Sequence, residues 1–113
     1  MDVTPLIRRD AKIIQSYQGG VFKISGETFA HSVLVMADRV VEWQGDFTML
    51  QDLGIEVLLF GTGEKQIWMT SSERRAIKDA HGFMVESMDN GAAARTYNAL
   101  MAEGRQVAAV LMI

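Results

Sequence analysis

The second half of the chain repeats one pattern three times: a helix-forming stretch ends in glycine and is followed by an apolar stretch of strand length. The units are residues 46–53, Gly54 and 55–60; residues 73–81, Gly82 and 83–86; and residues 92–103, Gly104 and 107–113. Glycine just past a helix end adopts the left-handed conformation without steric cost. Because helices that link strands are crossover connections, the pattern predicts an α/β domain with a largely parallel sheet flanked by helices.

Residues 55–60 form the first apolar strand of this series, and they end in the turn Gly61-Thr62-Gly63. Six residues are too few for a helix, and their composition is too apolar for a half-exposed strand. We therefore predict that this strand lies at the centre of the sheet. Residues 107–113 are apolar on both faces, so the chain end is also predicted to lie inside the sheet.

The first half of the chain is predicted to be mainly antiparallel β-structure. Residues 13–17 and 21–24 flank Gly19-Gly20, and paired glycines supply the positive φ angles that tight hairpin turns need. We predict an N-terminal β-hairpin here, followed by strands at residues 29–36 and 39–43. Residues 1–11 are predicted to be an irregular arm of a single domain that covers residues 1–113.

The composition excludes several classes of function. The 113 residues contain no cysteine, which removes thiol catalysis, disulfides and cysteine-based metal sites. The net charge of −3 argues against nucleic-acid binding, because the chain has no excess of Lys and Arg. No apolar run approaches the ~20 residues of a membrane span, so we predict a cytoplasmic protein without direct membrane insertion.

The loop after residue 60 is the best candidate for a binding site. It matches neither the dinucleotide-binding nor the phosphate-loop spacing. In a parallel sheet, however, this loop and the loop after residue 86 share the carboxyl edge, where α/β folds bind ligands. The predicted pocket contains Gly61, Thr62, Gly63, Asp89, Asn90, Arg95 and Asn98. A small anion could bind there at the start of the last helix, but a helix simply capped by Asp89 or Asn90 is the favoured interpretation.

Other polar residues do not form a catalytic constellation. His31 lies within a predicted strand, and His81 lies in the last turn of a predicted helix; neither has a carboxylate at metal-ligand spacing. Arg74, Arg75 and Lys78 form a basic stripe that is most simply a solvated helix face. The sequence therefore predicts no catalytic residue, no metal site and no cofactor. Of Trp43 and Trp68, at least one is predicted to pack in the core, with exposure at a protein interface as the alternative.

A set of residues in the second half resembles a known family. They are Trp43, Gly61-Thr62-Gly63, Val85-Glu86, Asp89, Ala93, Ala94, Thr96-Tyr97-Asn98, Leu100, Glu103-Gly104-Arg105, Val107 and Ala109. Their combination resembles a widespread family of small domains of unknown function that includes the mitochondrial respiratory complex I assembly factor 3. The resemblance runs from about residue 17 to residue 113. One departure is that Asn90 follows Asp89 where the family commonly has Thr.

The resemblance implies a three-layer α/β fold with a mixed sheet and an added β-hairpin, and it implies no established catalytic activity. It also implies action by protein association, as in complex I assembly, and this chain looks like a bacterial relative. Our leading hypothesis is a non-enzymatic interaction protein whose partner is a subunit of a respiratory or other membrane complex. The alternative is a small-molecule binding domain or enzyme, with Thr62, Asn90, Arg95 and Asn98 as polar contacts.

Overall fold

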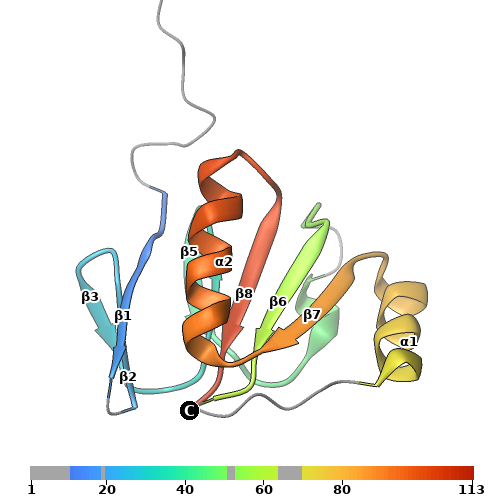
Figure 1. The fold of residues 1–113 in the computed structure, drawn as a ribbon, viewed down its shortest axis with the longest axis horizontal. Coiled ribbons are helices and arrows are strands. Elements are labelled where there is room, and N and C mark those ends of the chain that lie inside the picture. The colour runs from blue at the N-terminus through green and yellow to red at the C-terminus, as the bar shows by residue number, and fades with distance from the viewer. Residues whose placement is uncertain (1–10, 19, 51–52, 64–69) are drawn as a thin grey trace, which may run out of the picture.

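The computed structural model describes residues 11–18, 20–50, 53–63 and 70–113, which form two β-sheets and two α-helices (Figure 1). The smaller sheet contains β1 (Ile14–Gln18), β2 (Val21–Ile24) and β3 (Glu27–Phe29), all antiparallel. The predicted N-terminal hairpin is therefore present as β1 and β2. Most of the predicted arm, together with Gly19 and Trp68, lies outside the described residues.

The larger sheet has five strands in the order β5-β4-β8-β6-β7. Their bounds are β4 (Val33–Met36), β5 (Arg39–Glu42), β6 (Val57–Gly61), β7 (Met84–Met88) and β8 (Val107–Leu111). β6 runs parallel to both β7 and β8, whereas β4 runs antiparallel to both β5 and β8. The sheet is mixed, and only half of the pairings among these described strands are parallel.

Two predictions about this sheet were wrong. The central strand is β8, the last strand of the chain, and the strand predicted at residues 55–60 lies one place from the edge. The sheet is also less parallel than predicted. Both differences have one cause: the hairpin β4–β5 joins the sheet alongside β8, because its two strands are connected by a tight turn and need no crossover helix.

The strand predicted at residues 29–36 is in fact two strands in different sheets. Phe29 lies opposite Phe22 in the smaller sheet, whereas Val33 lies opposite Glu42 and Leu111 in the larger one. Residues 30–32 make the crossing between them. A continuous stretch of strand-forming residues does not reveal where a chain leaves one sheet for another, so sequence periodicity could not separate the two.

The first predicted helix, residues 46–53, is shortened to the single 3₁₀ turn η1 (Phe47–Leu50), and residues 51–52 lie outside the described part of the chain. The side chain of Asp46 accepts a hydrogen bond from the backbone N–H of Thr48 at 2.9 Å. This bond closes a tight turn between residues 46 and 48. Such a local side-chain bond competes with a regular α-helix for the backbone donor.

The other two predicted helices are present, and each begins two residues before its predicted start, at residue 71 rather than 73 and at residue 90 rather than 92. In α1 (Ser71–His81), Thr70 and Glu73 form the capping box that the sequence Thr70-Ser71-Ser72-Glu73 predicts, and Gly82 closes the helix with a φ of 84°. In α2 (Asn90–Ala102), Asp89 is the N-cap, because its carboxylate accepts from the backbone N–H of Ala92 at 2.8 Å. Neither helix in the described chain is long and apolar enough to cross a membrane.

Two apolar clusters cover opposite faces of the larger sheet. Alternate residues of β4 enter different clusters: Val33 and Val35 join one, whereas Leu34 and Met36 join the other. The first cluster is completed by α2 and the smaller sheet, with Tyr97 and Phe22 fully buried (Figure 1). The second lies under η1 and α1, and its buried residues include Leu50, Phe83 and Trp43. The prediction that one tryptophan packs in the core is therefore confirmed.

Candidate functional site

The side chain of Asn90 lies between the Gly61–Gly63 loop and the start of α2. Its Oδ1 accepts hydrogen bonds from the backbone N–H groups of Gly63 and Met112, each at 3.2 Å. Its Nδ2 donates to the carbonyl of Met112 at 2.6 Å, and its own backbone N–H donates to the carbonyl of Gly63 at 2.8 Å. Only 1% of the residue is exposed. Asn90 therefore joins the carboxyl ends of β6 and β8 to α2 with nearly all its hydrogen-bonding capacity in use.

The remaining residues of this loop also use their polar groups within the protein. The backbone N–H and the hydroxyl of Thr62 both donate to the carbonyl of Met88, at 2.8 and 3.2 Å. Gly61 is so closely surrounded that a Cβ there would lie 2.5 Å from Asn90 Oδ1 and 2.7 Å from the carbonyl oxygen of Val110. Five of the seven predicted site residues thus come together, namely Gly61, Thr62, Gly63, Asp89 and Asn90, and the Asn90 side chain occupies the space among them.

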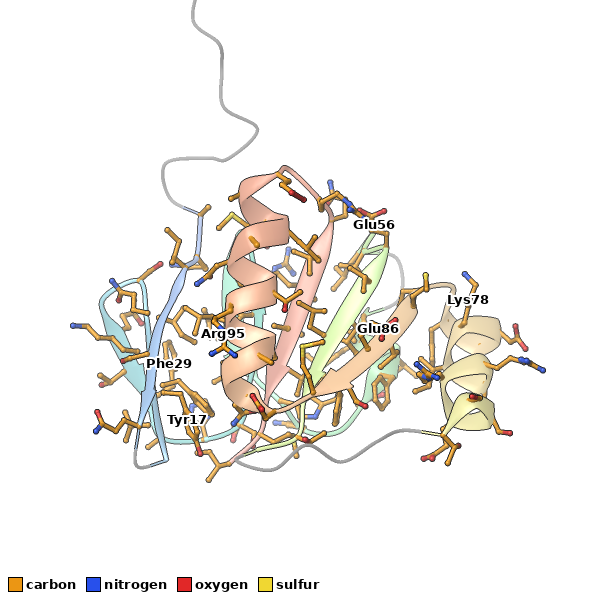
Figure 2. The ribbon with its side chains drawn as sticks, viewed as in Figure 1. Tyr17, Phe29, Glu56, Lys78, Glu86 and Arg95 are labelled. Atoms are coloured by element: carbon orange, nitrogen blue, oxygen red, sulfur yellow. The ribbon has the colours of Figure 1, made fainter. Side chains whose placement is uncertain are left out.

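The other two predicted residues lie further along α2. Arg95 is exposed, on the side of the helix toward β1 (Figure 2). Asn98 forms a pair of hydrogen bonds with the first strand: its Oδ1 accepts from the backbone N–H of Ile14 at 3.0 Å, and its Nδ2 donates to the Ile14 carbonyl at 2.8 Å. Asn98 thus hydrogen-bonds β1 as a neighbouring strand would, and it ties the smaller sheet to α2.

Tyr97 reinforces this connection, and sequence analysis gave it no such role. Its hydroxyl donates to the carbonyl of Lys12 at 2.8 Å, and its ring is fully buried. Burial raises the pKa of the phenol well above its usual value, so the group stays neutral and remains a donor. In the sequence, the helical spacing of Tyr97 from Ala93 and Met101 indicated only that these residues share an apolar face of the helix.

We expect replacement of Asn98 by alanine to weaken the attachment of the smaller sheet. Both backbone groups of Ile14 would lose their partners, and the loss of two such hydrogen bonds corresponds to about 2 kcal/mol of unfolding free energy. Amide hydrogen exchange at Ile14 should accelerate by more than the decrease in global unfolding free energy, measured by urea denaturation, accounts for. Replacement of the exposed Arg95 by alanine on the same helix is the control, with an expected change within about 0.5 kcal/mol. Equal effects of the two substitutions would contradict this role of Asn98.

Some charged groups elsewhere on the described surface are paired with one another. Arg105 donates to Glu56 at 2.6 Å, and this hydrogen bond lowers the pKa of the Glu56 carboxyl. Arg39 forms two hydrogen bonds with Asp38, at 3.1 and 2.8 Å. In the described part of the chain, no group of three or more His, Asp or Glu side chains has the arrangement of a metal site.

Two surface hollows lie away from the predicted pocket. One, of about 270 Å³, lies at the amino ends of β6 and β8, where Arg39 and Arg105 contribute to its wall. The other, of about 250 Å³, is a groove between α1 and β7. Arg74, Arg75 and Lys78 line this groove, so the basic stripe that the sequence showed borders a concave surface. Sequence analysis missed the groove because nothing in the spacing of α1 indicated that the edge of β7 lies beside it.

A family described as "Protein of unknown function (DUF498/DUF598)" matches residues 14–112. An uncharacterized protein of Rhodobacter capsulatus is 33% identical over 103 residues, which cover 88% of this chain and 82% of the relative. A protein of Francisella tularensis named "13 kDa major membrane protein" is 28% identical over 109 residues, covering 87% of this chain and 88% of the relative.

Solved structures show the same fold. A crystal structure of a Bordetella parapertussis protein superposes with a TM-score of 0.78 at 33% identity, covering 92% of this chain and 97% of the other. The crystal structure described as an outer membrane protein from Bartonella henselae superposes with a TM-score of 0.77 at 28% identity, covering 90% of this chain and 94% of the other. Both similarities extend over nearly the whole chain.

Proposed function

Because this chain belongs to the DUF498/DUF598 family, whose function is unknown, we propose its role from its own surfaces and from its relatives: a non-enzymatic interaction protein that serves the assembly or biogenesis of a respiratory or other membrane protein complex. Its partner is then a protein subunit of such a complex. A cytoplasmic location remains a prediction, and it is compatible with a protein that meets its partner at the membrane surface.

The observation that carries this proposal is the position of the Asn90 side chain. In α/β folds the carboxyl edge of the sheet is where small ligands are bound. Here Asn90 occupies that edge and bonds Gly63 and Met112 at 2.6 to 3.2 Å. A ligand would have to displace these bonds and leave buried backbone groups without partners. Recognition on an outer surface does not carry this penalty.

The names of relatives support the link to membranes. The Francisella relative is named a major membrane protein, and the Bartonella structure is described as an outer membrane protein. The resemblance to the family of the complex I assembly factor adds a specific class of membrane complex. In this protein neither described helix is long and apolar enough to cross a membrane, so we propose that association occurs through a protein subunit.

Removal of the protein from its bacterial cell tests this role. We expect native gels of solubilised membranes to show less of at least one fully assembled complex and more of its subassemblies. Expression of the wild-type chain should restore the assembled form. Unchanged amounts and sizes of all membrane complexes, in cells shown to lack the protein, would contradict the proposal.

Anion or metabolite binding at the Gly61–Gly63 loop is the alternative. Asp89 already caps α2 there, and Arg95 provides an exposed positive charge one turn further along. A thermal-shift screen with nucleotides, phosphorylated metabolites and organic acids separates the two proposals. A ligand at about 100 times its Kd adds roughly 2.7 kcal/mol to the unfolding free energy. A shift that Arg95→Glu abolishes would favour the alternative.

A further inference from the structure

The groove between α1 and β7 is a concave surface at the edge of the larger sheet. It is lined by Arg74, Arg75, Lys78, Met84, Val85 and Glu86. Figure 2 shows Lys78 and Glu86 on the two elements that flank it. β7 is the last strand in the described order of this sheet, and α1 lies beside it with no fully buried residue. The groove therefore lies at the edge of the larger sheet, at the periphery of the fold.

One wall of the groove is positively charged. Lys78 is four residues after Arg74 and three after Arg75, so the three side chains lie on the same face of α1. Arg74 lies 3.9 Å from Glu86, whereas Arg75 and Lys78 form no salt bridge within the described chain. The whole protein carries a net charge of −3, so this cluster reverses the prevailing sign. Charge complementarity favours an acidic partner.

The floor of the groove is apolar and adaptable. Met84 is 51% exposed, which is high for a large apolar side chain, whereas the neighbouring Val85 is buried in the core. Methionine is flexible and polarizable, and it is over-represented at surfaces that accept varied partners. An apolar side chain of a partner can therefore pack on Met84 while its acidic neighbours reach the wall of α1.

The groove offers side chains rather than an open strand edge. The N–H of Met84 donates to the carbonyl of Glu56 at 3.1 Å, so the backbone of Met84 is engaged with the inner neighbour β6. Val85 is only 3% exposed, so its backbone groups are almost closed to a partner. A partner therefore meets the charged side chains of α1 and the side chain of Met84.

We propose that the α1–β7 groove binds an extended acidic segment of a protein partner. Its carboxylates pair with Arg75 and Lys78, and an apolar side chain packs on Met84. This proposal rests on the proposed interaction function and adds the surface and the chemistry of the partner. An anionic membrane fits less well, because polybasic lipid-binding clusters contain about four to eight cations and this groove has three.

Fluorescence anisotropy with short labelled peptides tests the proposal on the full chain. We expect a peptide of alternating Glu and Val to bind, with affinity that falls as salt rises, and peptides of alternating Lys and Val or Gln and Val not to bind. The double substitution Arg75→Glu and Lys78→Glu should weaken binding about tenfold or more, because two attractive contacts become repulsive. Circular dichroism and urea denaturation should confirm that this exposed substitution leaves the fold intact.

The matched control is Lys12→Glu with Lys23→Glu. Each reversal changes the charge by −2, so both double variants change the net charge from −3 to −7. The control should bind the Glu–Val peptide as the wild type does. Equal weakening in both variants would overturn the groove as the site. So would binding of the wild type to vesicles of phosphatidylcholine with phosphatidylglycerol but not to the acidic peptide.

Recovery of partners from solubilised native membranes separates this proposal from the proposed function. If the wild type recovers a complex subunit and Arg75→Glu/Lys78→Glu does not, while Lys12→Glu/Lys23→Glu does, the groove is the binding surface. If all three recover the subunit equally, the groove proposal is overturned and the interaction function remains. If the wild type recovers none, the proposed function itself fails.

Discussion

Replacement of Asn90 by alanine should destabilise the protein by about 3 to 5 kcal/mol, a large part of the roughly 5 to 15 kcal/mol available to a domain of this kind. Three backbone groups, the N–H groups of Gly63 and Met112 and the carbonyl of Met112, would lose their hydrogen-bond partner in a buried setting. Urea denaturation should show the loss directly. At roughly 4 °C per kcal/mol, the melting temperature should fall by about 12 to 20 °C.

Asn90→Asp separates lost hydrogen bonds from lost volume. The carboxylate retains both bonds that Oδ1 accepts, but it replaces the Nδ2 donor with an oxygen that repels the Met112 carbonyl. Burial beside a carbonyl favours the protonated acid, so the folded-state pKa should exceed the unfolded value. Stability is then gained as pH falls through the folded-state pKa, because the protonated acid can donate to Met112. A decrease of less than about 1 kcal/mol in the unfolding free energy of Asn90→Ala would contradict the structural role of this side chain.

Gly61→Ala should destabilise the protein by about 2 to 3 kcal/mol through overpacking. The new Cβ would lie 2.5 Å from Asn90 Oδ1 and 2.7 Å from the backbone carbonyl of Val110. Neither atom can retreat easily, because Asn90 is held by its hydrogen bonds and Val110 belongs to the central strand β8. Denaturant unfolding measures the loss.

Gly91→Ala is the matched control, because its Cβ would meet the flexible end of Arg95 at 3.3 Å. Gly91 is helical, so alanine should leave stability unchanged or raise it by up to about 1 kcal/mol. The Gly61→Ala and Asn90→Ala substitutions should also combine non-additively, with a double variant less damaged than the sum, because Asn90→Ala removes one of the two clashes. Equal effects at Gly61 and Gly91 would show that close packing at β6 is not the cause.

The sequence predicted the elements that depend on local signals. The capping box of Thr70 and Glu73 and the glycine after α1 appear as expected, because hydrogen bonds and backbone conformations within a few residues determine them. The apolar character of residues 107–113 likewise indicated burial on both faces; residues 107–111 are buried in β8, whereas Ile113 at the chain end is 57% exposed, against the prediction. Long-range pairing gave no such signal. β8 lies at the centre because β4 pairs with it, and the paired residues are more than seventy positions apart in the chain.

The candidate site, too, could be predicted only in part. The meeting of the Gly61–Gly63 loop with the start of α2 follows from parallel strands sharing one edge, and the structure brings these segments together. The sequence could not show that Asn90 turns inward to bond Met112, because an Asn after an Asp at a helix start is also a common exposed residue. It also could not show the groove beside Lys78, which exists only because α1 lies next to the edge of β7.

Recovery of a protein partner tests the proposed interaction function most directly. The tagged full chain, expressed at its natural level, would be purified from gently solubilised native membranes and compared by quantitative mass spectrometry with an unrelated tagged protein of similar size. We predict a subunit of a respiratory or other membrane complex in near-stoichiometric amount, recoverable in the reverse direction when that subunit carries the tag. The absence of any stable partner above background in both directions would contradict the account.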